Sequence, residues 1–171
     1  MKIRKANIID ALAIAEVRVD TWQTTYRGII PDEHLDNLSY EDAENSFSEL
    51  ISKNNCFLYV AENEVGEIVG FAAAGAERFE NPYYQGEIYA MYVLKNNQRQ
   101  GIGTLLFRSM LKELKQLGFF SVILWVLAGN RYKKFYEDHG GKQIEFKIMN
   151  INGFDAELIG YGWPDISRLN I

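Results

Sequence analysis

Cysteine and histidine are scarce in this sequence, and the few that occur form no pattern. The single cysteine, Cys56, has no partner for a disulfide within the chain. The two histidines, His34 and His139, lie far apart and lack the spacing of a metal site. We therefore expect a protein of a reducing compartment, the cytoplasm, that binds no metal.

Clusters of basic residues and long hydrophobic runs are also missing. The formal net charge is −5 and no basic block exceeds a few residues, which argues against a nucleic-acid surface. The best apolar run, "VILWVLAG" (residues 122–129), is far shorter than the roughly 20 residues of a membrane helix. Near the start, Asp10 and Glu16 interrupt what would otherwise be the apolar core of a signal peptide. We expect neither nucleic acid nor membrane as a partner.

Regular hydrophobic patterns fill the rest of the chain. The length of 171 residues and the 47% hydrophobic content suit one domain, residues 1–171, with a core of its own. Apolar residues at helical spacing, with Asn7 and Ser39 as N-caps and Gly118 as a stop, predict helices. The expected helices cover residues 8–22, 39–51, 102–117 and 130–139. The expected strands cover residues 2–6, 56–62, 67–77, 86–94, 119–127, 142–150 and 154–163.

The order of these elements predicts a mixed sheet. The helix at 102–117 is long enough to join its flanking strands as a parallel pair. The other connections favour antiparallel pairing, with hairpins at residues 63–66 and 151–153. We predict an α/β (α+β) fold in which about seven mostly antiparallel strands carry helices on both faces. Residues 26–38 are expected to be a turn-rich connector.

Two glycines, Gly101 and Gly103, stand at the start of the 102–117 helix, where each costs roughly 1 kcal/mol of helix stability. A helix start offers free N–H groups and a positive dipole end, and glycines let a large anion approach the backbone. With Arg99 nearby, a diphosphate is the natural ligand; a tight turn without a ligand is the alternative. The segment has no G-K-[ST] and no third glycine, which excludes a P-loop and a dinucleotide fingerprint.

The segment Gln98-Arg99-Gln100-Gly101-Ile102-Gly103 matches the pattern [QR]-x-x-G-x-[GA]. A strand "EIYAMYVL" precedes it, a helix follows, and "LWVLAGN" and "FYEDHGG" come later in the chain. In this context the sequence resembles the GNAT superfamily of acyl-CoA-dependent N-acyltransferases, over essentially its whole length. It departs from the family pattern at Tyr132 and Gly141, where alanine and phenylalanine are usual.

The resemblance implies that strands 87–94 and 120–127 splay apart and that the pantetheine arm of acetyl-CoA lies in the gap. It implies acetyl-CoA as the co-substrate, no metal, an amine acceptor, and a homodimer as one form of assembly. The expected contacts with acetyl-CoA come from the main chain of the first strand, from the glycine segment and from one asparagine. These residues are Met91, Tyr92, Val93, Gln98, Arg99, Gln100, Gly101, Ile102, Gly103, Thr104 and Asn130.

Two residues are candidates for the chemistry. Tyr136, in the FY pair of the resemblance, would protonate the departing thiolate, because a phenol (pKa about 10) stays protonated at neutral pH. Its alternative role is that of a core aromatic residue. Glu87 aligns with the catalytic glutamate of the histone acetyltransferase branch and would be the general base; a solvated carboxylate at the strand start is the alternative. Glu77 and Glu80 are further candidates for the base.

The acceptor is expected to bind between residues 22–38 and 150–155. Trp22, Tyr26, Tyr83 and Tyr84 are candidates to line that pocket, although ordinary core packing also explains aromatic residues. The carboxylates of Asp32, Glu33, Glu77, Glu80 and Glu87 are compatible with a cationic amine.

Two functions remain open. The first is an N-acetyltransferase that acts on a small molecule or peptide by direct transfer in a ternary complex. The second is a non-catalytic module that binds or senses acyl-CoA. Both functions need the glycine segment, whereas only the enzyme needs Tyr136 and a means of deprotonating the amine.

Overall fold

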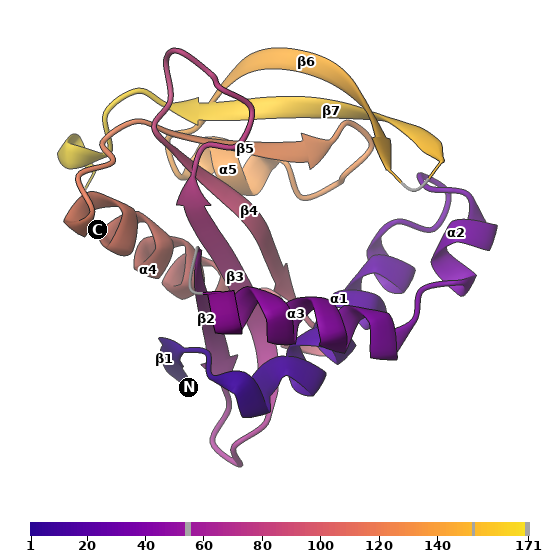
Figure 1. Ribbon diagram of the computed structural model, residues 1–171. Helices are drawn as coiled ribbons and strands as arrows, with labels where there is room; N and C mark the ends of the chain where they lie inside the picture. Colours follow the sequence, from indigo (N-terminus) through magenta and orange to yellow (C-terminus); the bar gives the residue numbers. More distant parts are fainter. Residues whose placement is uncertain (54–55, 152, 170–171) are drawn as a thin grey trace.

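A single seven-stranded sheet runs through the computed structural model, which describes residues 1–53, 56–151 and 153–169. Its strands follow the order β1-β2-β3-β4-β5-β7-β6 (Figure 1). They are β1 (Lys2–Lys5), β2 (Phe57–Glu62), β3 (Ile68–Ala76), β4 (Gly86–Val93), β5 (Val122–Leu127), β6 (Lys142–Ile151) and β7 (Phe154–Trp163). Neighbouring strands are antiparallel except β4 and β5, which are parallel. The predicted mixed sheet is confirmed.

Helices cover both faces of this sheet, as the sequence predicts. On one face α1 (Ala11–Thr25) and α3 (Tyr40–Lys53) pack their buried side chains against β2 and β3. On the other face lie α4 (Ile102–Gln116) and the short α5 (Lys134–Asp138), whose apolar residues join the core of the sheet. Short 3-10 turns occur at Ile8–Asp10, Lys95–Asn97 and Ile166–Arg168. Within the described residues, no helix combines the length and hydrophobicity needed to cross a bilayer.

The capping signals in the sequence act as expected. The Asn7 side chain accepts a hydrogen bond from the amide of Ile9 and begins the turn that leads into α1. The Ser39 hydroxyl accepts from the amide of Asp42, 3.1 Å away, at the start of α3. Gly118 follows α4 with a φ of 83°, a backbone conformation that glycine adopts without strain. Local sequence therefore sets these helix boundaries.

One helix, α2 (Asp32–Asp36), lies where the sequence predicts only a turn-rich connector. It follows Pro31 and carries Asp32 and Glu33 in its first turn, where acidic side chains favour the helix dipole. Arg27 pairs with Asp32 and Asp36 from outside the helix. A single turn is too short for a hydrophobic period, so the pattern could not reveal it.

The loop between β6 and β7 lies in the predicted place. Its central residue, Asn152, is outside the described residues, and the strands pair up to Ile151 and Phe154 on either side. The Asn150 side chain accepts a hydrogen bond from the amide of Gly153 at 2.9 Å.

An irregularity in β4 opens the sheet. Ala73 of β3 lies opposite Ala90, whereas Ala74 lies opposite Ile88, so Tyr89 has no partner and forms a β-bulge. On its other side β4 pairs with β5 only from Gly86 to Ile88. Beyond Ile88 the two strands diverge, and the main-chain groups of β4 that face β5 have no strand partner there.

The first strand and the start of α1 are joined by a buried ion pair. Arg4 contacts Asp10 at 2.8 Å and Glu62 at 2.6 Å, and Asp10 also accepts from the amide of Asn7 at 2.8 Å. The side-chain hydrogen bonds from Arg4, more than any other contact, lower the pKa of Asp10.

We expect Asp10→Asn to lower the free energy of unfolding at pH 7 by about 1–3 kcal/mol, because Arg4 loses a buried charged partner. The folded-state pKa of Asp10 is depressed, so its stabilisation is present above the unfolded pKa of about 3.9 and disappears as pH falls through the folded value. Urea unfolding at pH 7 and pH 3 measures this. A difference between wild type and variant that is equally large at both values would contradict it.

Candidate active site

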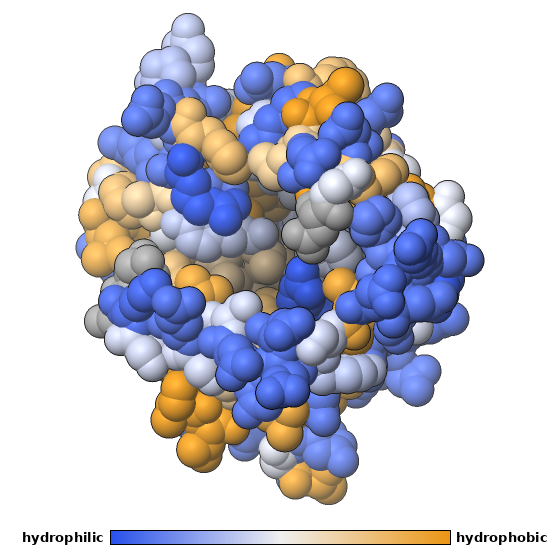
Figure 2. Space-filling view, turned by 45° about the vertical axis from the view of Figure 1, so that its right-hand side comes forward, coloured by the Kyte–Doolittle hydropathy of each residue, from blue (hydrophilic) through white to orange (hydrophobic). Residues whose placement is uncertain are grey.

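A cavity of about 720 Å³ lies where β4 and β5 diverge. Its walls come from both strands, the end of α1, the loop between β3 and β4, the start of α4, and α5. Figure 2 shows a hollow near the centre of one molecular face, with a neutral to hydrophobic floor and a largely hydrophilic rim. Among the predicted cofactor contacts, those that line the cavity are Met91, Tyr92, Val93, Gln98, Arg99, Gly101, Gly103, Thr104 and Asn130.

At one end of the cavity the chain presents free amides. Arg99 has a φ of 63° and Gly101 a φ of 82°, both in the left-handed region. Within the described part of the chain, the amides from Arg99 to Thr104 donate no hydrogen bond. Unpaired N–H groups at a helix start can bind an anion, and Arg99, Gly101, Gly103 and Thr104 of this run line the cavity.

The side chains of the glycine segment (residues 98–103) make contacts that the sequence alone did not predict. Gln98 donates from Nε2 to the carbonyl oxygen of Val93 at 2.9 Å, which fixes the loop to the end of β4. Gln100 is exposed and donates to the carbonyl of Asn96, whereas the Ile102 side chain is buried in the core. Neither Gln100 nor Ile102 lines the cavity, unlike the other predicted cofactor contacts of this segment.

Tyr136 lines the cavity from α5. Burial, and to a lesser extent the neighbouring phenol of Tyr92, raises the pKa of Tyr136 well above the ordinary value. Its hydroxyl therefore stays protonated and can donate a hydrogen bond. The helix is anchored through Gly141, where a Cβ would lie 2.6 Å from the Trp163 ring and 2.9 Å from the Tyr136 carbonyl. Trp163 thus leaves no room at position 141 for the phenylalanine that the family pattern has there.

Two more polar side chains meet Tyr136 in the cavity wall. Asn130 is buried; it accepts from the amide of Tyr132 at 2.8 Å, and its Nδ2 lies 3.3 Å from the Tyr26 hydroxyl. Burial, followed by the phenols of Tyr92 and Tyr136, raises the pKa of Tyr26. Phenol side chains from the end of α1, from β4 and from α5 thus converge on one region of the cavity.

Glu87 is placed differently from a free general base. It is 1% exposed, and its carboxylate accepts hydrogen bonds from Arg78: 2.6 Å from Nη2, 3.1 Å from Nε and 3.2 Å from the amide. The Arg78 guanidinium also stacks 4.0 Å above the ring of Tyr89. Arg78 lines the cavity and Glu87 does not, so the carboxylate reaches the cavity only through its partner.

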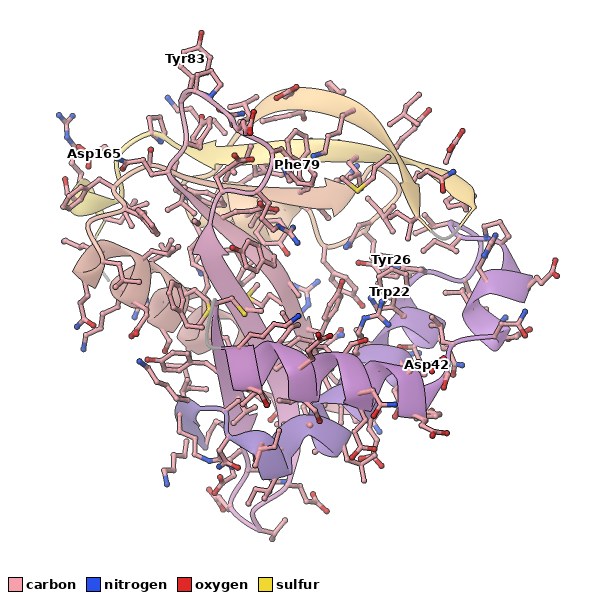
Figure 3. All side chains as sticks on the ribbon, viewed as in Figure 1. Trp22, Tyr26, Asp42, Phe79, Tyr83 and Asp165 are labelled. Carbon is pink, nitrogen blue, oxygen red and sulfur yellow. The ribbon has the colours of Figure 1, made fainter. Side chains whose placement is uncertain are left out.

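The aromatic residues expected around the acceptor divide into two groups. Trp22 and Tyr26, at the end of α1, line the cavity (Figure 3). Tyr83 is 80% exposed and points away from the molecule in Figure 3, and Tyr84 packs over Gly162 instead. The expectation for Tyr83 and Tyr84 is therefore wrong: the loop between β3 and β4 turns them away from the cavity.

Three residues in or beside the cavity were missed by the sequence reasoning. Phe79 and Trp125 line the cavity, and the ammonium group of Lys147 lies 3.6 Å from the centroid of each ring. In the sequence, Trp125 lies within an apolar strand and therefore looks like a core residue. Lys147 lies in a hairpin strand with alternating polar and apolar residues and therefore looks like a surface lysine. No sequence signal joins residues this far apart.

Comparison with known proteins agrees with this geometry. Residues 16–140 match the model of the Acetyltransferase (GNAT) family, so the chain belongs to that family. The uncharacterized N-acetyltransferase YuaI of Bacillus subtilis is 37% identical over 167 residues, which cover 98% of this chain and 95% of that protein. The resemblance inferred from the glycine segment is confirmed.

Two solved structures share the fold. The PaiA N-acetyltransferase of Thermoplasma acidophilum, in complex with coenzyme A, has a TM-score of 0.68 at 22% identity, covering 95% of this chain and 98% of that one. The putative acetyltransferase YncA of Salmonella typhimurium, with its cofactor acetyl-CoA, has a TM-score of 0.71 at 16% identity, covering 99% and 96%.

Proposed function

We propose that this protein transfers the acetyl group of acetyl-CoA directly to a primary amine, in a ternary complex. The observation that carries the proposal is one cavity that joins three parts. Unpaired amides for a diphosphate lie at one end, β4 edge groups without a strand partner lie in the gap, and the protonated Tyr136 hydroxyl lies in the wall. The GNAT relatives solved with coenzyme A and acetyl-CoA support it.

The proposed reaction follows from these parts. The amides from Arg99 to Thr104 hold the diphosphate, and the free edge of β4 pairs with the pantetheine arm as an added strand. The amine attacks the thioester carbonyl, and main-chain N–H groups near Met91 stabilise the oxyanion. As the C–S bond breaks, Tyr136 donates its hydroxyl hydrogen to the thiolate. The attacking nitrogen releases its extra proton to solvent, and the Tyr136 phenolate takes a proton back from water before the next turnover.

A module that only binds acyl-CoA is the second candidate, because the amides and the free strand edge suffice for binding. Thiol release from acetyl-CoA, measured across amino acids, polyamines, aminoglycosides and peptides, distinguishes the two functions. We expect at least one class of amine to release CoA at a rate that depends on the concentration of the amine. Tight CoA binding without turnover across the panel would favour the binding module.

The pH dependence of turnover in a Glu87 variant tests whether Glu87 deprotonates the amine. We propose that Glu87 holds Arg78 in the cavity wall and that the amine reacts from its neutral fraction, which grows with pH. Glu87→Gln should then lower turnover by a similar factor at pH 7 and at pH 9.5, because only the positioning of Arg78 is lost. Stopped assays across this pH range measure the ratio of wild type to variant. A deficit that shrinks as pH rises would assign Glu87 as the general base after all.

A further inference from the structure

The charged groups around the cavity are mostly cationic. Arg99, Arg131 and Lys134 line it on the side of the glycine segment and α5, and Arg78 lines the acceptor side. Among the described residues, Asp138 is the only carboxylate in the lining, and it pairs with Lys134 at 2.9 Å. The carboxylates expected to attract a cationic acceptor, at positions 32, 33, 77, 80 and 87, do not line the cavity.

Lys147 is a further cation beside the cavity: it is not part of the lining itself, but its ammonium lies against the rings of Phe79 and Trp125, which are. Its ammonium lies between the rings of Phe79 and Trp125, and it makes no ion pair or hydrogen bond with any residue in the described part of the chain. The carboxylates of Glu77, Glu87 and Glu145 act on it only from beyond ion-pair distance, and Glu87 is already bound to Arg78. Burial lowers the pKa of Lys147, as expected of a cation without a carboxylate partner.

Among the described residues, some hydrogen-bond donors in the cavity wall also lack partners. Within the described residues, the indole nitrogens of Trp22 and Trp125 and the hydroxyl of Thr21, which is 4% exposed, are buried without a hydrogen bond. All three residues line the same cavity. An indole N–H can only donate, so the group that satisfies it must be an acceptor, such as a carboxylate oxygen. Buried donors left unpaired cost free energy, which a ligand would recover.

We propose that the acceptor is an amine that also carries a carboxylate or a comparable oxyanion, and that Lys147 binds this anion beside Trp125. The proposal rests on the acetyl transfer proposed above and names its substrate class: small molecules of the amino-acid type. Phe79 and Trp125 hold the ammonium itself between their rings, so the charge is placed before the acceptor arrives (Figure 3 shows Phe79 on its loop). Polyamines lack the anion and do not fit this site.

Matched acceptors test the class. Each amino acid of a panel is compared with the amine that lacks its carboxylate, for example phenylalanine with phenethylamine, by CoA release at saturating acetyl-CoA. We expect kcat/KM to be about 10- to 100-fold higher for the amino acid, the range of a hydrogen bond to a charged group. Equal or faster acetylation of the simple amines would overturn the proposal. If neither member of any pair reacts while CoA binds, acetyl transfer itself fails and the inference falls with it.

Variants of Lys147 test the residue. Lys147→Met keeps a flexible apolar stem between the two rings and removes the charge, Lys147→Arg keeps the charge, and Lys142→Met removes an exposed charge from the same strand. We expect Lys147→Met to raise KM for the amino acid about 10- to 100-fold, with KM for the matched amine unchanged. Lys147→Arg should recover most of the loss, and Lys142→Met should behave as wild type.

Binding gives a readout that is independent of turnover. Tryptophan fluorescence of the CoA-loaded protein, titrated with the preferred amino acid, should show the same loss of affinity in Lys147→Met. An equal loss for the amino acid and for the simple amine would show that Lys147 only supports Phe79. That result would overturn its role in anion binding.

Discussion

Gly103→Glu is expected to abolish CoA binding while the protein stays folded. Gly103 lies in the first turn of α4, and a Cβ built there would lie 3.4 Å from the Phe135 ring, an ordinary contact. The side chain would enter the cavity among the unpaired amides and bring a negative charge to the place proposed for the diphosphate. Like charges about 4 Å apart repel by several kcal/mol in a partly buried site, so we expect CoA affinity to fall at least about 100-fold.

Gly103→Gln has nearly the same size without the charge and serves as the matched control. If charge is the main cause, the glutamine variant keeps a measurable affinity that the glutamate variant loses. Calorimetric titration with CoA measures both variants, and thermal unfolding shows that they are folded. Unchanged CoA affinity in a folded Gly103→Glu variant would remove the diphosphate from the α4 start.

Tyr136→Phe should lower turnover by about 100- to 10,000-fold, with nearly unchanged affinity for acetyl-CoA. The substitution removes one hydroxyl and keeps the ring, which packs against Phe135 at 5.4 Å and Tyr161 at 5.8 Å between centroids. The proposed CoA contacts are main-chain groups elsewhere, so only the departing sulfur loses its donor. A water molecule in the open part of the cavity would move the loss toward the lower value.

Tyr161→Phe is the control for this effect. The Tyr161 hydroxyl donates to Glu137 at 2.9 Å, and Tyr161 does not line the cavity, so turnover should stay close to that of wild type. Pre-steady-state measurement of thiol release separates the chemical step from product release. Turnover of Tyr136→Phe within a factor of about two of wild type would show that Tyr136 is a packing residue and not the proton donor.

Local patterns account for the features that the sequence predicted correctly. Helix periods, caps such as Ser39 and the stop at Gly118 depend on residues within a few positions of one another. The parallel pairing of β4 with β5 follows from the length of the connection through α4. The glycine segment is equally local, since the ligand site predicted there would be built from consecutive amides; that site remains a prediction.

Features that depend on distant contacts were beyond the sequence. The ring of Phe79, in the loop between β3 and β4, contacts Lys147 of β6. Nothing in the sequence near either residue predicts this contact. Glu87 looks like a free carboxylate until the loop between β3 and β4 brings Arg78 over it. The bulge at Tyr89 could not be predicted, because the alternating residue pattern of β4 continues through it. An unpaired residue can be recognised only when the strand is aligned with its partner.

The short seam, meaning the three residue pairs that join β4 to β5, bears on how large an acyl group the cavity can accept. In the described part of the chain, the two strands pair from Gly86 to Ile88 with Val122 to Leu124, and the cavity lies beyond these pairs. Ile88 and Leu124 stand where the seam ends and both line the cavity, so they form the closed end of the gap. An acyl chain longer than acetyl that points toward the seam would meet these two side chains first. If the protein acts as proposed, we expect discrimination between acetyl and longer thioesters to depend on the branched side chains of Ile88 and Leu124 rather than on the main-chain amides at the α4 start.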